Sequence, residues 1–294
     1  MSEIPRGLTA VLGFFDGVHR GHRELFAAAA RYGAPVLAWT FSSGDRTDLL
    51  TDDEERFGLL HEAGAEYLCA ADFGEIRDVD GEAFAKDVLF SLLGIGRAVV
   101  GESFRFGKGA ARNSEDLVRL CSEAGVPCTV LPTVTDGGAP VSSSSIRKLI
   151  ASGDVESASR LLGFPTANQI IPKSLVTPAR GVYVCRASFE EGGTGRRFPG
   201  VLNIGVCPTL SRDTIAAFRE ENPDYDLPDE TIIGREVMET HVIGYEGDLY
   251  GKILRIGLCR KLRDEIKFGS VEELTDRIRA DENSALEYFK DNKL

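Results

Sequence analysis

The first half of the chain alternates short apolar runs with amphipathic segments. Residues 9–15 and 35–41 are apolar at nearly every position, not at every second one. Such runs are typical of strands buried on both faces, as in parallel sheets that helices cover on both sides. Further strands of this kind are expected at 65–73, 97–104 and 127–134. Helices are expected between them, at 22–33, 52–64, 81–94 and 114–125. The pattern predicts an α/β domain with a doubly wound parallel sheet.

The pattern changes after a helix expected at 154–163. Strand-like segments then follow one another without helices between them, at 181–189, 198–206, 236–245 and 252–262. Turn-rich stretches separate them, which is typical of an antiparallel β-barrel. Ser270 and Glu273 form a capping-box pattern before a last helix. We therefore expect two domains, 1–160 and 161–294, the second an antiparallel β-barrel with a C-terminal helix.

Composition narrows the classes of function. The chain carries 34 basic and 46 acidic residues, a net charge of −12, which argues against general binding to nucleic acids or anionic membranes. The N-terminus has no apolar signal region, and no apolar run is long enough to span a bilayer. The six cysteines show neither a CxxC pair nor a Cys/His metal spacing, which suits reduced thiols. These features favour a cytoplasmic protein.

The segment GFFDGVHRGH at 13–22 contains two of the four histidines, three residues apart. It runs from the end of the first expected strand into a helix N-terminus, where free N–H groups and the helix dipole favour anions. Gly17 and Gly21 would let a ligand approach the backbone closely. His19 and His22 project from one side of the first turn and can donate hydrogen bonds to phosphate oxygens. The segment predicts a nucleotide site that stabilises charge without a side-chain nucleophile.

Two other roles for these histidines remain as alternatives. A histidine is more often structural than catalytic, but the HxGH pattern at a strand–helix junction favours the nucleotide site. A zinc site would need a third and usually a fourth ligand. The other two histidines, His61 and His241, lie far away in the sequence, and no cysteine is near. The sequence therefore favours a nucleotide over a metal.

Two further segments have residue types that suit phosphates. VSSSSIRKLI places a hydroxyl cluster and Arg147 at another loop–helix junction, although a serine N-cap beside a solvated arginine would have the same sequence. VVGESFRFGKGAARN follows a buried strand, and Arg105, Lys108 and Arg112 would line the strand ends unless the loop is simply solvated. Because ligands bind at the carboxyl ends of parallel strands, both segments are candidates for the same site.

Taken together, these segments resemble the prokaryotic bifunctional riboflavin kinase/FMN adenylyltransferase family, the FAD synthetases. The resemblance covers nearly the whole chain. HxGH alone is shared by many nucleotidyltransferases, whereas the ordered set is specific. The motifs that occur in the family's order are LGFFDGVHRGH, VVGESFRFGKG, VSSSSIRKLIASGDVESASRLLG, GFPTAN, GVYV, LNIGVCPT, ETHVIGYEGDLYGK and LRDEIKFGSVEEL.

The resemblance implies that the N-terminal domain is a nucleotidyltransferase that moves AMP from ATP to FMN, giving FAD and pyrophosphate. His19, His22 and Arg147 match catalytic positions that contact the ATP phosphates. Mg²⁺ is the expected cofactor, ATP the co-substrate, and riboflavin, FMN and ATP the expected small-molecule partners. The residues expected to surround the nucleotides are Gly13, Phe14, Asp16, Gly17, Gly21, Gly101, Phe104, Arg105, Phe106, Ser142 and Ser143.

The resemblance also implies an ATP-dependent riboflavin kinase in the C-terminal domain. Thr166 and Asn168 of PTAN match its Mg²⁺–ATP residues, and Glu239 of ETH matches its catalytic base. The chain departs from the family after Gly163, where a strand and a glycine- and arginine-rich loop are missing before Phe164. This gap predicts a weakened kinase, unless the native chain contains the segment.

Two other departures concern loops. The stretch between Thr209 and Glu239 is longer than usual, which predicts a surface insertion. WTFSSG replaces a proline-containing loop beside the nucleotide pocket. Two alternative functions are a flavin-nucleotide binder without kinase turnover and a class I aminoacyl-tRNA synthetase. The acidic charge and the lack of a lysine-rich second signature disfavour the synthetase.

Overall fold

A computed structural model describes residues 5–163, 166–167, 175–191, 194–206, 236–247, 249, 253–266, 268 and 271–292. The chain divides into two compact units. The first contains the described residues up to 148 together with 161–163 and 175–176. The second contains 149–160, 166–167 and the described residues from 177 onward. The predicted Ser270 cap, the Asn168 site and nearly all of the insertion before Glu239 lie outside the described residues.

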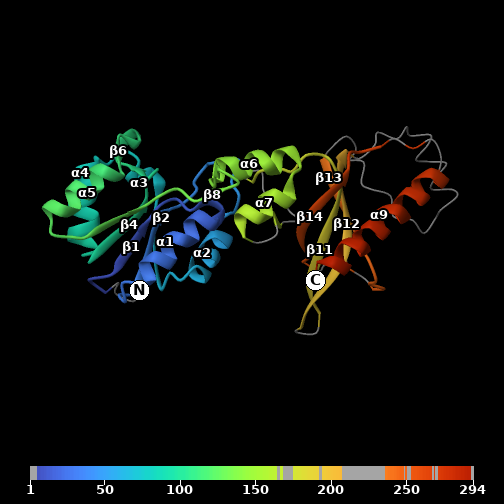
Figure 1. The fold of residues 1–294 in the computed structure, drawn as a ribbon, viewed down its shortest axis with the longest axis horizontal. Helices are drawn as coiled ribbons and strands as arrows, with labels where there is room; N and C mark the ends of the chain where they lie inside the picture. Colours follow the sequence, from blue (N-terminus) through green and yellow to red (C-terminus); the bar gives the residue numbers. More distant parts are fainter. Residues whose placement is uncertain are drawn as a thin grey trace. The chain divides into compact units, whose positions relative to one another are not determined.

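A five-stranded parallel sheet forms the centre of the first unit (Figure 1). Its order is β3-β2-β1-β4-β7, and β1 is paired with both β2 and β4. The strands are β1 (Thr9–Leu12), β2 (Val36–Phe41), β3 (Tyr67–Ala71), β4 (Arg97–Gly101) and β7 (Cys128–Leu131). The doubly wound fold predicted from the sequence is confirmed. Strands β1, β2 and β4 are buried on both faces, while β3 alternates because it lies at an edge.

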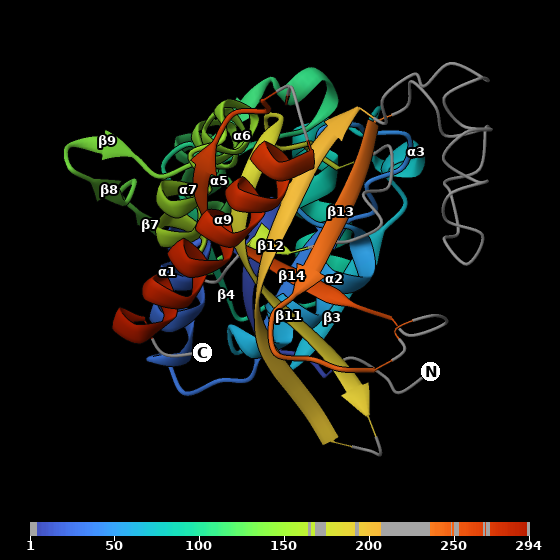
Figure 2. The ribbon, with the colours of Figure 1, turned by 90° about the vertical axis from the view of Figure 1, so that its right-hand side faces the viewer.

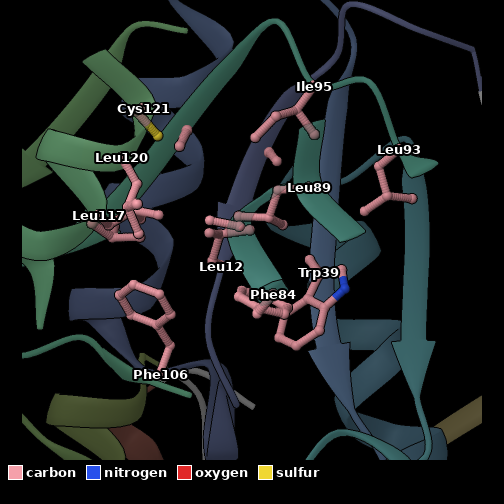
Figure 3. Packing of buried hydrophobic residues seen from close by; sticks show 14 of the residues in the cluster. Leu12, Trp39, Phe84, Leu89, Leu93, Ile95, Phe106, Leu117, Leu120 and Cys121 are labelled. Carbon is pink, nitrogen blue, oxygen red and sulfur yellow. The ribbon is translucent and has the colours of Figure 1, made fainter. Parts of the chain in front are cut away.

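Helices cover both faces of this sheet (Figure 1). On one face, α1 (Arg20–Ala30) and α2 (Asp53–Glu62) pack Phe26 and Leu60 against Val11 and Ala38. The other face is covered by α4 (Gly81–Ala83), the π-helix η2 (Phe84–Leu92) and α5 (Ser114–Glu123). Figure 3 shows the apolar cluster on that face, in which Trp39 of β2 lies beside Phe84 of η2. The two clusters fix the sheet between its helical layers.

Short elements fill the connections of the first unit and lead out of it. The early ones are η1 (Asp16–Val18), α3 (Phe73–Ile76), β5 (Arg105–Phe106), η3 (Lys108–Ala110) and β6 (Arg112–Asn113). The later ones are β8 (Thr135–Asp136), β9 (Ala139–Pro140), α6 (Ser143–Ser152) and α7 (Val155–Leu162). None of the helices among the described residues is both long and apolar enough to cross a membrane.

The second unit is built on a five-stranded antiparallel sheet with the order β10-β14-β11-β12-β13. Its strands are β10 (Thr166–Ala167), β11 (Gly181–Glu191), β12 (Thr194–Val206), β13 (Glu236–Val242) and β14 (Arg255–Arg263). Figure 2 shows the long β11–β12 hairpin and the helix α9 (Val271–Asp291), which packs on β11 and β12. The predicted antiparallel domain with a C-terminal helix is confirmed.

A buried ion pair attaches α9 to the sheet. Arg263 of β14 donates from Nη2 and Nε to Oδ2 of Asp281, at 2.7 and 3.0 Å, and both side chains are nearly covered. Removing one partner of a buried pair leaves the other charge without compensation. We expect Asp281→Ala to lower the free energy of unfolding of the second unit by about 3 kcal/mol, measured by urea titration with far-UV circular dichroism.

The matched control is Asp276→Ala, because Asp276 lies on the same helix in an exposed pair with Arg279 at 3.7 Å. Exposed pairs of this kind contribute about 0–1 kcal/mol. Equal losses for the two variants would show that the Arg263–Asp281 pair has no special role.

Candidate functional site

A pocket lies where the order of the parallel strands changes direction. From β1 the chain proceeds to β2 and β3 on one side, and then crosses to β4 on the other. A crevice between the carboxyl ends of β1 and β4 is the usual ligand site in such sheets. A pocket of about 690 Å³ opens there, lined by residues that follow all five strands. The GFFDGVHRGH and GESFRFGKG segments, predicted from the sequence to form one site, both contribute to it.

The loop after β1 has a strained backbone. Phe15 has a φ of 60° and Val18 a φ of 38°, in the left-handed region that side chains other than glycine rarely adopt. Gly17 between them has a φ of 76°, and a Cβ there would meet Leu50 at 2.7 Å. Strain of this kind persists where surrounding contacts fix it, and it is commonly found at functional sites. Here it turns the chain directly into α1.

The two histidines lie against each other at the N-terminus of α1. His19 is the N-cap, and its Nδ1 accepts a hydrogen bond from the His22 backbone N–H at 3.4 Å. The two rings stack with centroids 3.6 Å apart. Because Nδ1 of His19 accepts, the proton of its neutral ring lies on Nε2, where it can be donated to a ligand. Nδ1 of His22 is buried and has no partner among the described residues.

Burial keeps both imidazoles neutral near pH 7. It lowers the pKa of His19 from 6.5 to about 4. The pKa of His22 lies well below its ordinary value, first because of burial and second because of the adjacent His19. Each ring therefore offers one N–H donor without carrying a fixed charge.

This burial predicts an acid-dependent loss of stability. Because the pKa of His19 is lower in the folded state, the unfolded chain takes up the proton first as the pH falls. The stability present above pH 6.5 is therefore lost as the pH falls toward 4. For His19 the loss between pH 7 and pH 5 is about 2 kcal/mol. We expect His19→Asn, which keeps an N-cap acceptor, to reduce the pH dependence by this amount. Urea unfolding can be followed through the fluorescence of the single tryptophan, Trp39. Equal pH dependence in both proteins would contradict the assignment.

Asp16 joins the two segments that the sequence singled out. Its buried carboxylate accepts from Arg147 Nη2 at 2.5 Å and from the Leu50 N–H at 2.9 Å. Its backbone carbonyl accepts from the Ser143 hydroxyl at 2.9 Å. The start of α6 is thereby fixed beside the loop after β1. Arg147 Nε is buried without a partner among the described residues, so this guanidinium retains an N–H for a ligand.

The other end of the pocket is aromatic. Phe14 and Phe41 stack with centroids 4.9 Å apart, Phe73 lies 5.1 Å from Phe41, and all three are half-buried. Phe104 and Phe106 form a second stacked pair, at 5.6 Å. Trp39 and Phe84, which Figure 3 shows side by side, also line the pocket. Such a wall suits a flat, largely apolar ring system.

Positive charge is concentrated in this pocket although the chain is acidic. Arg46, Arg77, Arg105 and Arg147 line it, together with a single carboxylate, that of Asp16. Arg105 lies where the sequence predicted. Lys108 and Arg112 do not line the pocket, because they pair with Asp78 at 3.2 Å and Asp116 at 3.3 Å. Arginines suit phosphate oxygens because of their fork of donors.

The first-unit residues that the resemblance assigns to the nucleotide site all line this one pocket except Gly17, which lies in the loop beside it. Sequence reasoning missed Arg46, Arg77 and Phe73, which also line it. They follow β2 and β3, and the rule that ligands bind at carboxyl ends of strands could have indicated them.

The residues predicted for the kinase site are less completely described. Glu239 is exposed on β13, and the Asn203 amide donates to its Oε2 at 3.4 Å. Thr166 lies in β10, at the opposite end of the described sheet order, and Asn168 lies outside the described residues. That Thr166, Asn168 and Glu239 form one site stays a prediction.

Comparisons with known proteins match each half of the chain to a different family. The family described as FAD synthetase matches residues 1–145, and the family described as riboflavin kinase matches residues 144–289. A "Macrolide-efflux Protein" structure from Streptococcus pneumoniae has a TM-score of 0.78 over 96% of this chain and 95% of its own. At 22% identity, that likeness supports the fold alone.

Curated relatives match over nearly the full length. The bifunctional riboflavin kinase/FMN adenylyltransferase of Escherichia coli K12 is 30% identical, with 98% of this chain and 95% of the relative covered. The enzyme of the same name from Bacillus subtilis is 28% identical, with 95% and 91% covered. The chain belongs to the family of bifunctional riboflavin kinases/FMN adenylyltransferases, and it is an enzyme with an FAD synthetase domain and a riboflavin kinase domain.

Proposed function

We propose that the pocket of the first unit transfers AMP from ATP to FMN, giving FAD and pyrophosphate. One observation carries this proposal: the Asp16–Arg147 ion pair joins the HxGH loop and the SSxxIR helix at one pocket. That pocket combines donors for phosphates with an aromatic wall for a flavin. In the reaction an oxygen of the FMN phosphate attacks the α-phosphorus of ATP. The bond from the α-phosphorus to the bridging oxygen breaks, and pyrophosphate leaves with the electron pair.

The residues act by positioning and by stabilising charge, since the phosphate of FMN is itself the nucleophile. The neutral rings of His19 and His22 donate to phosphate oxygens on which negative charge increases. Arg147 would donate to the leaving pyrophosphate from N–H groups that Asp16 does not occupy, and Ser142 would supply a further hydroxyl at the start of α6. Asp16 would hold Arg147 in place beside the nucleotide. Its carboxylate already accepts three hydrogen bonds, from the backbone of Leu50 and Thr51 and from Arg147.

Mg²⁺ is proposed as the cofactor of both reactions. The described residues contain no group of three or more histidine, cysteine or acidic side chains able to hold a metal, and Arg147 already neutralises Asp16. In the first unit Mg²⁺ would therefore be bound mainly by ATP oxygens, where it neutralises phosphate charge. In the second unit Thr166 and Asn168 are proposed to hold it beside ATP.

The kinase reaction is proposed for the second unit. Glu239 would accept the proton of a riboflavin hydroxyl as that oxygen attacks the γ-phosphorus of ATP, and ADP would leave. Both reactions use small molecules, which fits a cytoplasmic enzyme without nucleic-acid or membrane partners.

Incubation of the full chain with FMN, ATP and Mg²⁺ tests the principal proposal. Equal amounts of FAD and pyrophosphate should form, measured by chromatography and by a coupled pyrophosphate assay. An ATP analogue with a methylene group between the α- and β-phosphates should give no FAD, because the bond that must break is replaced by carbon. Binding of FMN and ATP without FAD formation would contradict the proposal.

A further inference from the structure

Arg46 occupies the aromatic part of the pocket. We call the rings of Phe14, Phe41 and Phe73 the aromatic wall. The Arg46 guanidinium carbon lies 4.5 Å from the Phe14 ring centroid, 5.8 Å from that of Phe41 and 5.6 Å from that of Phe73. The residue lies on the loop after β2, and it is exposed. A planar group over three half-buried rings marks a place where a flat molecule fits.

A second arginine at the same wall behaves differently. Arg56 of α2 is fully buried, lies 4.2 Å from the Phe14 centroid and donates to Asp53 at 2.6 Å and to the Phe41 carbonyl at 2.9 Å. These bonds fix Arg56 in place. Arg46 forms no ion pair with a carboxylate among the described residues, and it lies close enough to Arg56 for the two positive charges to repel. Arg46 is therefore the member of the pair that can move.

We infer that Arg46 is a binding residue that clamps the ring system of the flavin against the aromatic wall. This inference rests on the proposed function. An isoalloxazine ring that enters the pocket displaces the guanidinium from the wall and stacks on the phenyl rings in its place. Arg46 then covers the outer face of the flavin, which is held between two planar surfaces. A cation–aromatic contact in water is weak, so the displacement is readily offset by the larger stacked area.

Three substitutions separate the flat face of Arg46 from its charge. Arg46→Met removes both, Arg46→Lys keeps the charge, and Arg46→Tyr keeps a flat surface. We expect Arg46→Met to raise the KM for FMN by about 5- to 10-fold, with kcat and the KM for ATP unchanged. Arg46→Tyr should restore most of the affinity for FMN, and Arg46→Lys should not. Arg31→Met, the same exchange at an exposed arginine after α1, is the matched control.

Any other result would contradict the inference that Arg46 clamps the flavin. An unchanged KM for FMN in Arg46→Met would mean that Arg46 only shields the rings, and a lower KM would mean that it blocks the pocket. Restoration by lysine but not by tyrosine would indicate contact with the FMN phosphate. If the wild-type chain makes no FAD, the proposed function fails instead. Quenching of FMN fluorescence by the wild type and Arg46→Met then decides the clamp, since equal affinities would overturn it.

Discussion

Replacement of His22 by alanine is expected to lower the kcat for FAD formation by about 100- to 1,000-fold, the usual effect of removing one donor that stabilises developing charge. His22 stacks on His19 inside the pocket, and its buried Nδ1 has no partner among the described residues. A neutral donor in this position needs no reorganisation when charge develops on the phosphates. The effect should appear in kcat more than in KM, because the interaction is strongest in the transition state.

Initial rates at saturating FMN and ATP measure this effect. His61→Ala is the matched control, because His61 is exposed at the end of α2 and does not line the pocket. Its rate should remain near that of the wild type. Thermal melting, followed through Trp39, checks that both variants are folded. A His22→Ala enzyme that retains more than about a tenth of the wild-type kcat would remove His22 from the catalytic role.

The parallel sheet could be predicted from the sequence because its central strands show burial directly. β1, β2 and β4 have continuous apolar runs, and each was expected within a few residues of its bounds. The pattern of β3 reflects its edge position, which depends on strand order and not on local sequence. The π-helix at Phe84–Leu92 was expected only as an ordinary helix. An apolar segment of this composition does not distinguish a π-helix from an α-helix.

The two ends of the pocket differ in how well the sequence predicts them. At the phosphate end, glycines and histidines at a strand–helix junction have a local physical meaning, and the structure brings those segments together. The contact of Asp16 with Arg147 joins residues 131 positions apart, so no local pattern shows it. At the aromatic end, Phe73 and Arg46 come from the connections after different strands. Their proximity depends on the strand order, which fixes which loops become neighbours.

Riboflavin phosphorylation is the reaction in which this chain should differ most from its relatives. The alignment to the Escherichia coli enzyme extends over 324 positions, more than the 294 residues of the chain, so the relative has segments that this chain lacks. We infer that the principal one is the strand and loop missing between Gly163 and Phe164. Phosphoryl transfer requires ATP in line with the acceptor and water excluded from it, and a covering loop supplies both.

We therefore expect kcat/KM for riboflavin phosphorylation to be about 100-fold or more below that for FAD formation in the same mass-verified sample. Insertion of the relative's segment between Gly163 and Phe164 should raise the kinase rate and leave FAD formation unchanged. Glu239→Gln in the extended chain should abolish that gain. The inserted segment would only position ATP, and Glu239 would still be needed as the base. Kinase turnover equal to FAD formation in the 294-residue chain would show that the segment is dispensable. Unchanged turnover after insertion would show that another feature limits the kinase rate. The 3.4 Å contact of Glu239 with Asn203 would then be the next candidate.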